Sequence, residues 1–153
     1  MSNIRQDHTY VYVALLQEDA QIPNRATDRS AGFDLYSASD YSVEVKSIQS
    51  VDTGIQLVLP RDKFGYITGR SSYSIQKIFV IPGVIDSEYF LTLKILVLNG
   101  SDKPLEIKKG DRVAQLLILP TFQNNLRLLP PQTVYPVRNQ GAHDHTGFGS
   151  TGK

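Results

Sequence analysis

The sequence contains no cysteine and carries almost no net charge. Without cysteine, the protein cannot form disulfides, bind a metal through thiolates or use a thiol nucleophile. The formal charge of +1 produces no overall field that would attract nucleic acid or a membrane surface, so we expect neither as a partner. Any anion that the protein binds must therefore be held by a local group of residues.

Long apolar runs are also missing. The longest, Tyr10–Leu16, is too short to cross a bilayer, and the first eight residues lack the apolar core of a signal peptide. These absences predict a soluble intracellular protein of a reducing compartment, either the cytoplasm or the nucleus. The 153 residues, of which 41% are hydrophobic and 20% charged, suffice for one core but not for two ordinary domains. We therefore expect a single domain over 1–153 with a loose N-terminus over residues 1–8.

Strand signals recur along the chain as far as residue 119. β-Branched and aromatic residues, period-two alternation and closely spaced turn residues predict strands over 10–16, 31–38, 42–47, 53–59, 64–68, 91–98, 105–108 and 113–119. One or two helical turns are expected only over Ser72–Lys77, with a serine capping the first N–H groups. Many short strands separated by tight turns are typical of an all-β sandwich or barrel.

The C-terminal region, from about residue 130 to 153, changes to prolines and then glycines. This change predicts an extended arm rather than a core element. Composition alone favours a disordered tail, whereas Phe148, placed between two glycines, argues that the arm docks somewhere. The nearby His143 and His145 could share a metal ion, although so short a motif is more typical of a solvated segment.

The stretch Pro82–Phe90 combines a turn, a lone acid in apolar surroundings and an aromatic ring. Gly83 has no Cβ, so it can adopt a positive φ or let a ligand come close. Asp86 follows Ile85 where the apolar pattern enters a sheet, and carboxylates are rarely buried there without a partner. Taken alone, the stretch favours Asp86 as a turn residue that bonds its own backbone.

Five segments occur in one order over almost the whole chain: Ala31–Ala38, Gly69–Ser72, Gly83–Tyr89, Gly110–Leu117 and Gly147–Gly152. Together they resemble the five motifs of the trimeric dUTPases. The Arg-Ser-Ser form of the second segment and Pro82 before the third are most similar to viral, retroviral-like members. The resemblance implies an all-β, distorted jelly-roll-like β-barrel that forms a homotrimer, with a swapped or crossing C-terminal arm and active sites at the subunit interfaces.

The resemblance also implies an activity, the hydrolysis of dUTP to dUMP and pyrophosphate with Mg²⁺. Asp86 matches the catalytic aspartate, which activates a water for in-line attack on the α-phosphate. Tyr89 matches the aromatic residue under the deoxyribose, where the ring leaves no room for a 2′-hydroxyl. Asp34 matches the aspartate that approaches Mg²⁺ through water, an ion held largely by waters and substrate phosphates.

Further residues match the family's substrate contacts. The backbone of Gly83, Val84 and Ile85 and the return strand at Lys94 match the hairpin that pairs with the edge of uracil. The implied phosphate contacts are Arg70, Ser71, Ser72, Gln115, Arg138, Gly149, Ser150 and Thr151, and Phe148 matches the aromatic that covers the base. Asp111 and Arg112 are expected to shape the site or the trimer rather than to touch substrate.

The chain departs from the family pattern mainly in the arm. Ten positions separate Arg138 from Phe148, more than the family usually has, and Thr146 replaces a common glycine. Glu88 and Leu91 replace a usual aspartate and glycine. The stretched arm leaves open a catalytically weak or inactive dUTPase-like interaction protein. A third alternative is a nucleotide deaminase on the same fold, but the third motif contains no deaminase signature. Composition and periodicity alone predict only a β-barrel binding module.

Overall fold

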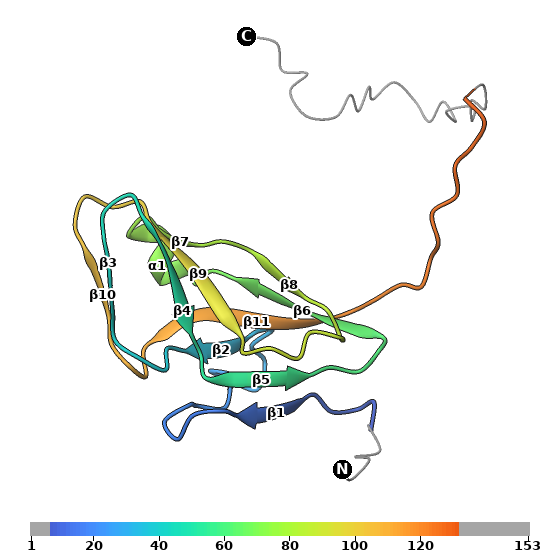
Figure 1. Ribbon diagram of the computed structural model, residues 1–153, viewed down its shortest axis with the longest axis horizontal. Coiled ribbons are helices and arrows are strands. Elements are labelled where there is room, and N and C mark those ends of the chain that lie inside the picture. Colours follow the sequence, from blue (N-terminus) through green and yellow to red (C-terminus); the bar gives the residue numbers. More distant parts are fainter. Residues whose placement is uncertain (1–6, 132–153) are drawn as a thin grey trace. The chain divides into compact units, whose positions relative to one another are not determined.

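The computed structural model describes residues 7–131 (Figure 1). The chain divides into two compact units, Met1–Gln123 and Asn124–Lys153, and every strand of the described residues lies in the first. The elements are β1 Tyr12–Leu15, β2 Phe33–Tyr36, β3 Tyr41–Val43, β4 Ile48–Asp52, β5 Ile55–Val58, β6 Lys63–Thr68, α1 Ser71–Ile75, β7 Ile78–Val80, β8 Gly83–Ile85, β9 Lys94–Asn99, β10 Leu105–Ile107 and β11 Arg112–Pro120.

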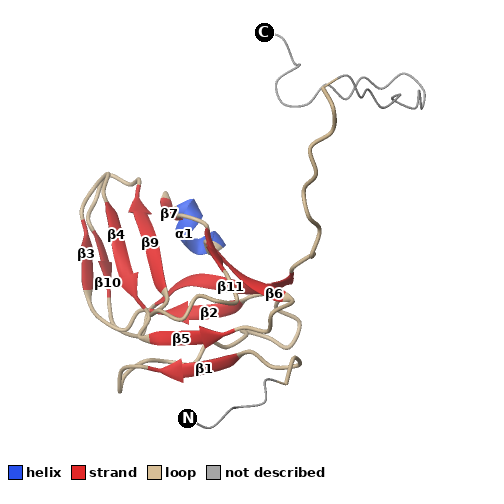
Figure 2. Cartoon of the chain, turned by 45° about the vertical axis from the view of Figure 1, so that its right-hand side comes forward, coloured by secondary structure: helices blue, strands red, loops and turns tan. Residues whose placement is uncertain are grey.

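Four small antiparallel sheets build the first unit. The largest has the order β2-β11-β6-β8, and a second has the order β4-β9-β7, while β1 pairs with β5 and β10 pairs with β3. Figure 2 shows β3, β10, β4 and β9 standing side by side, with β2, β5 and β1 running across their lower ends. The expected all-β class is confirmed.

Alternating strand residues supply the core, because successive side chains of a strand point to opposite faces. In β5, Ile55 and Leu57 are buried, and in β9 Ile95 and Val97 are buried. Burying one such side chain stabilises the fold by about 1.5–3 kcal/mol. β9 is the central strand of its sheet as expected, but only one of its faces is covered within one chain, since Leu96 is 42% exposed.

The expected strand over 42–47 is wrong in its second half. β3 ends at Val43, and the chain turns with Lys46 at a positive φ and the Ser47 N–H donating to the Glu44 carbonyl oxygen. The sequence does not predict β4, β7 or β8. Each is short, and its outer face carries an exposed apolar residue, so the alternation typical of a half-buried strand is weak.

The only helix of the described residues, α1, lies where helical turns were predicted, but its cap differs. It begins at Ser71, and the capping residue is Arg70, which makes no side-chain capping hydrogen bond. The Arg70 carbonyl oxygen instead accepts from the N–H groups of Tyr73 and Ser74. Within residues 7–131, no helix is long and apolar enough to cross a membrane.

Candidate active site

One cluster of predicted site residues lies where β2, β6 and β11 run side by side. The central strand β11 places Gln115 directly opposite Asp34 of β2 and opposite Thr68 of β6. Arg70 follows two residues after the end of β6. Three segments that are distant in sequence therefore bring a carboxylate, an amide and a guanidinium together.

Ion pairs hold the Arg70 guanidinium in this cluster. Its Nε lies 3.4 Å from Asp34 Oδ1, and its Nη1 donates to the Arg112 carbonyl oxygen at 3.0 Å. Nη1 of Arg112 lies 3.5 Å from Asp34 Oδ2, so one carboxylate faces two cations. An arginine side chain has five N–H groups, and these contacts use two of those on Arg70. The cluster therefore keeps a net positive charge and unused donors for an anion.

Two glycines position the Gln115 side chain, and the sequence interpretation assigned this role to neither. The Gln115 Nε2 donates to the Gly69 carbonyl oxygen at 2.8 Å. Its Oε1 lies 2.5 Å from the position that a Cβ on residue 32 would occupy, so only a glycine leaves room for this amide. Gly32 was visible as part of the first motif, but its contact with Gln115 depends on the pairing of β2 with β11.

Ser71 and Ser72 begin α1 beside this cluster, and both are exposed. Neither hydroxyl hydrogen-bonds to another described residue, so both remain available to a ligand. Tyr73 is the half-buried residue of the helix, and burial raises the pKa of its phenol, with a further upward effect from Asp111 and a downward effect from Arg70. This phenol therefore stays protonated at neutral pH.

A second cluster surrounds a cavity of about 370 Å³. The residues lining it are Arg61, Lys63, Phe64, Asp86, Ser87, Glu88, Tyr89, Thr121 and Gln123. The Asp86 carbonyl oxygen accepts from the Tyr89 N–H at 3.0 Å, and the Tyr89 hydroxyl donates to the Thr92 carbonyl oxygen at 3.1 Å. These two bonds form the turn and fix the tyrosine ring beside the cavity.

Asp86 is a turn residue through its backbone, but not in the way expected of a structural aspartate. Its side chain is exposed and makes no hydrogen bond to any described residue. The interpretation that the carboxylate bonds its own backbone is therefore wrong. A carboxylate that is not used by the fold remains free to accept hydrogen bonds from a ligand or water.

Gly83 does not adopt the positive φ that was one of its two expected roles. The described glycines with positive φ are Gly54 and Gly110, and Gly83 is part of β8. Its other expected role, letting a ligand come close, stays a prediction. The ladder of β7 and β9 ends where the Ile81 N–H donates to the Leu96 carbonyl oxygen. In that register the next hydrogen-bonded pair, two residues on, would be Gly83 and Lys94, but β8 turns away to pair with β6.

The edge of β8 is therefore open. β8 is the last strand of its sheet, so backbone groups of Gly83, Val84 and Ile85 that face away from β6 have no strand partner among the described residues. Lys94 begins β9, and its side chain is exposed. Open backbone donors and acceptors at the mouth of a hairpin are suited to pairing with the edge of a planar base.

The two clusters lie at opposite ends of β6. Ile85 pairs with Gly65, which places Asp86 near Phe64, whereas Gln115 pairs with Thr68. Four strand residues span about 13 Å at roughly 3.3 Å per residue, and Arg70 lies beyond them. Within one chain, Asp86 and Tyr89 therefore form a group separate from the Arg70 cluster.

Several predicted residues lie outside the described part of the chain. They are Arg138, Phe148, Gly149, Ser150 and Thr151 of the arm, together with the histidine pair at 143 and 145. Among residues 7–131, no group of three or more His, Cys, Asp or Glu side chains could hold a metal ion by itself. Asp34 is the one carboxylate of the first cluster, which fits an ion that is held mainly by waters and substrate phosphates.

The fold and the two clusters define an all-β protein with a cationic anion-binding group and a separate free carboxylate beside an aromatic cavity. The sequence model of the dUTPase family matches residues 18–152. The chain therefore belongs to the dUTPase family.

Individual relatives agree with this assignment. The chain is 43% identical over 108 residues to the deoxyuridine 5'-triphosphate nucleotidohydrolase of Yaba monkey tumor virus (strain VR587), which covers 70% of this chain and 76% of the viral protein. It is 35% identical over 164 residues to the protein of the same name from Wolbachia sp. subsp. Brugia malayi (strain TRS), over the full length of both. A mutant dUTPase from phage phi11 of S. aureus matches with a TM-score of 0.73 and 25% identity over 78% of this chain and 96% of that chain. The expected dUTPase-like, jelly-roll-like fold is confirmed.

Proposed function

We propose that the two clusters are halves of one active site, which hydrolyses dUTP to dUMP and pyrophosphate across a subunit boundary. As a member of the dUTPase family, the chain is a dUTP diphosphatase. The observation that carries the mechanism is the free carboxylate of Asp86 beside the Tyr89 ring, at the opposite end of β6 from the Arg70 cluster.

Asp86 is the proposed general base. Its carboxylate is exposed and not used by the fold, so it can orient a water and accept its proton as the water attacks the α-phosphorus in line with the leaving pyrophosphate. The hydrogen bond from Tyr89 to Thr92 holds the ring in one orientation beside the cavity. A fixed ring under the deoxyribose excludes a 2′-hydroxyl by contact.

Base selection is proposed at the open end of the hairpin. Uracil offers an acceptor, donor, acceptor edge to the backbone of Gly83, Val84, Ile85 and Lys94. Cytosine would place its amino donor against another donor and leave a buried group unpaired, at a cost of about 1–3 kcal/mol. Thymine is excluded by the volume of its methyl group rather than by hydrogen bonding.

Phosphate binding is proposed at the Arg70 cluster, with Ser71, Ser72 and Gln115. The free N–H groups of Arg70 and the exposed hydroxyls of α1 face solvent, where charge-assisted bonds to phosphate oxygens are strong. Asp34 would hold Mg²⁺ through water, and the ion would supply positive charge that neutralises the phosphates. The phage phi11 relative is described with a structural Mg(II) ion, which supports this ion here.

We further propose, from the motif resemblance, that the arm contributes to this site. Phe148 would cover the base, and Arg138, Gly149, Ser150 and Thr151 would reach the phosphates, by the motif resemblance. Closure of such a segment over a bound nucleotide would exclude water other than the attacking one.

We propose that the chain forms a homotrimer, as the motif resemblance implies, and the separation of the two clusters and two exposed surfaces support an association of copies. On the outer face of the β4-β9-β7 sheet, Ile48, Leu98 and Phe79 lie in one row, and the first and last are 56% and 45% exposed. Such a patch marks an interaction surface. We propose that copies of the chain pack on this face.

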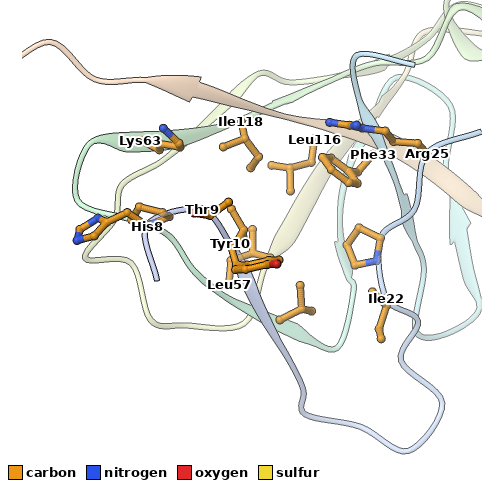
Figure 3. A pocket seen from close by; sticks show the side chains of 14 residues that line it. His8, Thr9, Tyr10, Ile22, Arg25, Phe33, Leu57, Lys63, Leu116 and Ile118 are labelled. Atoms are coloured by element: carbon orange, nitrogen blue, oxygen red, sulfur yellow. The ribbon is translucent and has the colours of Figure 1, made fainter. Parts of the chain in front are cut away.

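The second surface is a cavity of about 390 Å³ between the N-terminal segment, the Ile22–Arg25 loop and the sheet of β2 and β11 (Figure 3). Its walls are largely apolar, with Phe33, Leu57 and Leu116 among them. Leu126 and Leu128, two residues apart, are almost fully exposed. We propose that a neighbouring copy inserts this leucine segment there, as the crossing arm of the trimer.

The proposed function is tested by pyrophosphate release from dUTP with Mg²⁺, measured beside UTP, dTTP and dCTP. Rapid release from dUTP is expected, with kcat/KM about five- to a hundredfold lower for dCTP and also lower for UTP and dTTP, because each fails at the base or the sugar. Absence of release from dUTP, in a protein that is folded and trimeric by light scattering, would refute the activity. No described residue favours the catalytically inactive alternative, since Asp86, Tyr89, Arg70 and Gln115 are all present.

Gly32→Ala is expected to raise KM for dUTP about tenfold with little change in Tm. The new Cβ would lie 2.5 Å from Gln115 Oε1, so the amide must move and lose its bond to the Gly69 carbonyl oxygen. Steady-state kinetics and thermal unfolding measure the two effects. In a Gln115→Ala background the same substitution should add little, because the displaced amide is already absent. An equal loss in both backgrounds would show that Gly32 acts elsewhere.

A further inference from the structure

Arg112 is the residue of the phosphate-side cluster to which the motif resemblance gives no substrate contact. It begins β11, its side chain is 51% exposed, and its Nη1 lies 3.5 Å from Asp34 Oδ2. Its backbone carbonyl oxygen accepts from Arg70 Nη1. One residue therefore holds Arg70 twice, directly through its backbone and indirectly through the Asp34 carboxylate.

A β-bulge puts Arg112 in this place. In the pairing of β11 with β2, Arg112 lies opposite Tyr36 and Gln115 lies opposite Asp34, with a register shift between Arg112 and Ala114. Residues three apart in a regular strand point to opposite faces. The extra residue turns Arg112 and Gln115 to the same face as Asp34, and Val113 and Ala114 are both buried as a result. Bulges commonly re-aim side chains in this way next to active sites.

We propose that Arg112 is a positioning residue, which acts through Asp34 to keep the Arg70 guanidinium aimed at the substrate phosphates. The inference rests on the proposed function, because it assigns a role within that phosphate site. Asp34 is only 13% exposed on its side chain, so its charge is poorly screened by water. With Arg112 present, the carboxylate divides its attraction between two guanidinium groups.

Loss of the Arg112 charge changes this balance. Asp34 would then neutralise Arg70 alone, and the cluster would fall from one net positive charge to none. The Arg70 guanidinium would also be free to rotate toward both carboxylate oxygens, because a bidentate pair is the favoured arrangement of these groups. The first change weakens the attraction of the phosphates, and the second takes N–H donors of Arg70 away from them. The backbone contact from Arg112 survives any side-chain substitution, so a variant isolates the Asp34 route.

The test compares Arg112→Gln and Arg112→Lys with Arg29→Gln, a matched control. Arg29 is an exposed arginine that forms no ion pair among residues 7–131. Binding of inorganic pyrophosphate is measured by calorimetry without Mg²⁺, and dUTP kinetics are measured with it. Arg112→Gln should weaken pyrophosphate binding and raise KM about tenfold each, with kcat within about threefold of the wild type. Arg112→Lys, which keeps the charge near Asp34, should recover most of the affinity, and Arg29→Gln should change neither.

A double-mutant cycle with Asp34→Asn separates positioning from direct contact. If Arg112 acts through Asp34, its replacement should cost little more in the Asp34→Asn background. If Arg112→Gln causes the full loss of affinity in the Asp34→Asn background as well, Arg112 contacts the phosphate directly and the proposal is overturned. It is also overturned if Arg112→Gln leaves the pyrophosphate affinity of the otherwise wild-type protein unchanged. If Arg112→Gln does not fold, Arg112→Met, which keeps the length of the side chain and removes the charge, takes its place in the same cycle. Because pyrophosphate binding is read without turnover, a wild type that binds it but leaves dUTP intact would refute the proposed function and not this one.

Discussion

Asp86→Asn is expected to lower kcat for dUTP by about a thousandfold or more while KM, trimer formation and Tm stay close to the wild type. The asparagine side chain has nearly the same shape but cannot accept the proton of the attacking water. The native carboxylate makes no hydrogen bond to any described residue, so its loss removes no contact on which the fold depends. Stopped-flow measurement of proton release from dUTP with Mg²⁺ gives the rate.

Glu88→Gln is the matched control for this variant. Glu88 lines the same cavity, is also exposed and loses the same charge, so a general electrostatic effect would appear in both. A change of less than about threefold is expected for it. If Asp86→Asn turned over dUTP at the wild-type rate, Asp86 could not be the base. If both variants were equally slow, the negative charge of the cavity rather than one positioned carboxylate would be responsible.

The strands could be predicted from the sequence where one face is clearly buried. The alternation in β5 and the apolar run of β9 are local signals, and both strands formed near their expected positions. β4 and β7 could not be predicted, because Ile48 and Phe79 face outward and blur the alternation. An apolar residue on the outer face of a strand fits the alternation only if a second copy of the chain covers that face.

The site residues also fall into two groups, those that the sequence indicates and those that only the strand pairing reveals. Asp86, Tyr89 and Arg70 could be identified because each belongs to a short motif whose residue types suit the chemistry. The ion pairs of Asp34 with Arg70 and Arg112 could not, since they depend on strand pairing and on a bulge that shifts the register of β11. A motif thus indicates which residues act, while the register determines which residues hold them.

Mixing two inactive variants is expected to restore activity, and this result depends on the separation of the clusters along β6. Asp86→Asn removes the base and leaves the Arg70 cluster intact, whereas Arg70→Gln does the reverse. In a cyclic trimer that contains both variants, one of the three interfaces joins an intact base from one subunit to an intact phosphate group from another. Mixed trimers from co-expressed variants should therefore recover roughly a third of the wild-type rate per trimer.

The measurement requires co-purification through two different affinity tags, so that only mixed trimers are assayed. Each variant alone should remain at least about a hundredfold below the wild type, and mixing the separately folded proteins without subunit exchange should restore nothing. A site contained in one chain predicts no recovery, because every subunit would carry one defect in its own site. Within one chain, the register of β6 places the backbones of the two clusters about 13 Å apart, which favours the shared site. The yield of intact sites therefore reports directly whether Asp86 of one copy serves the Arg70 cluster of another.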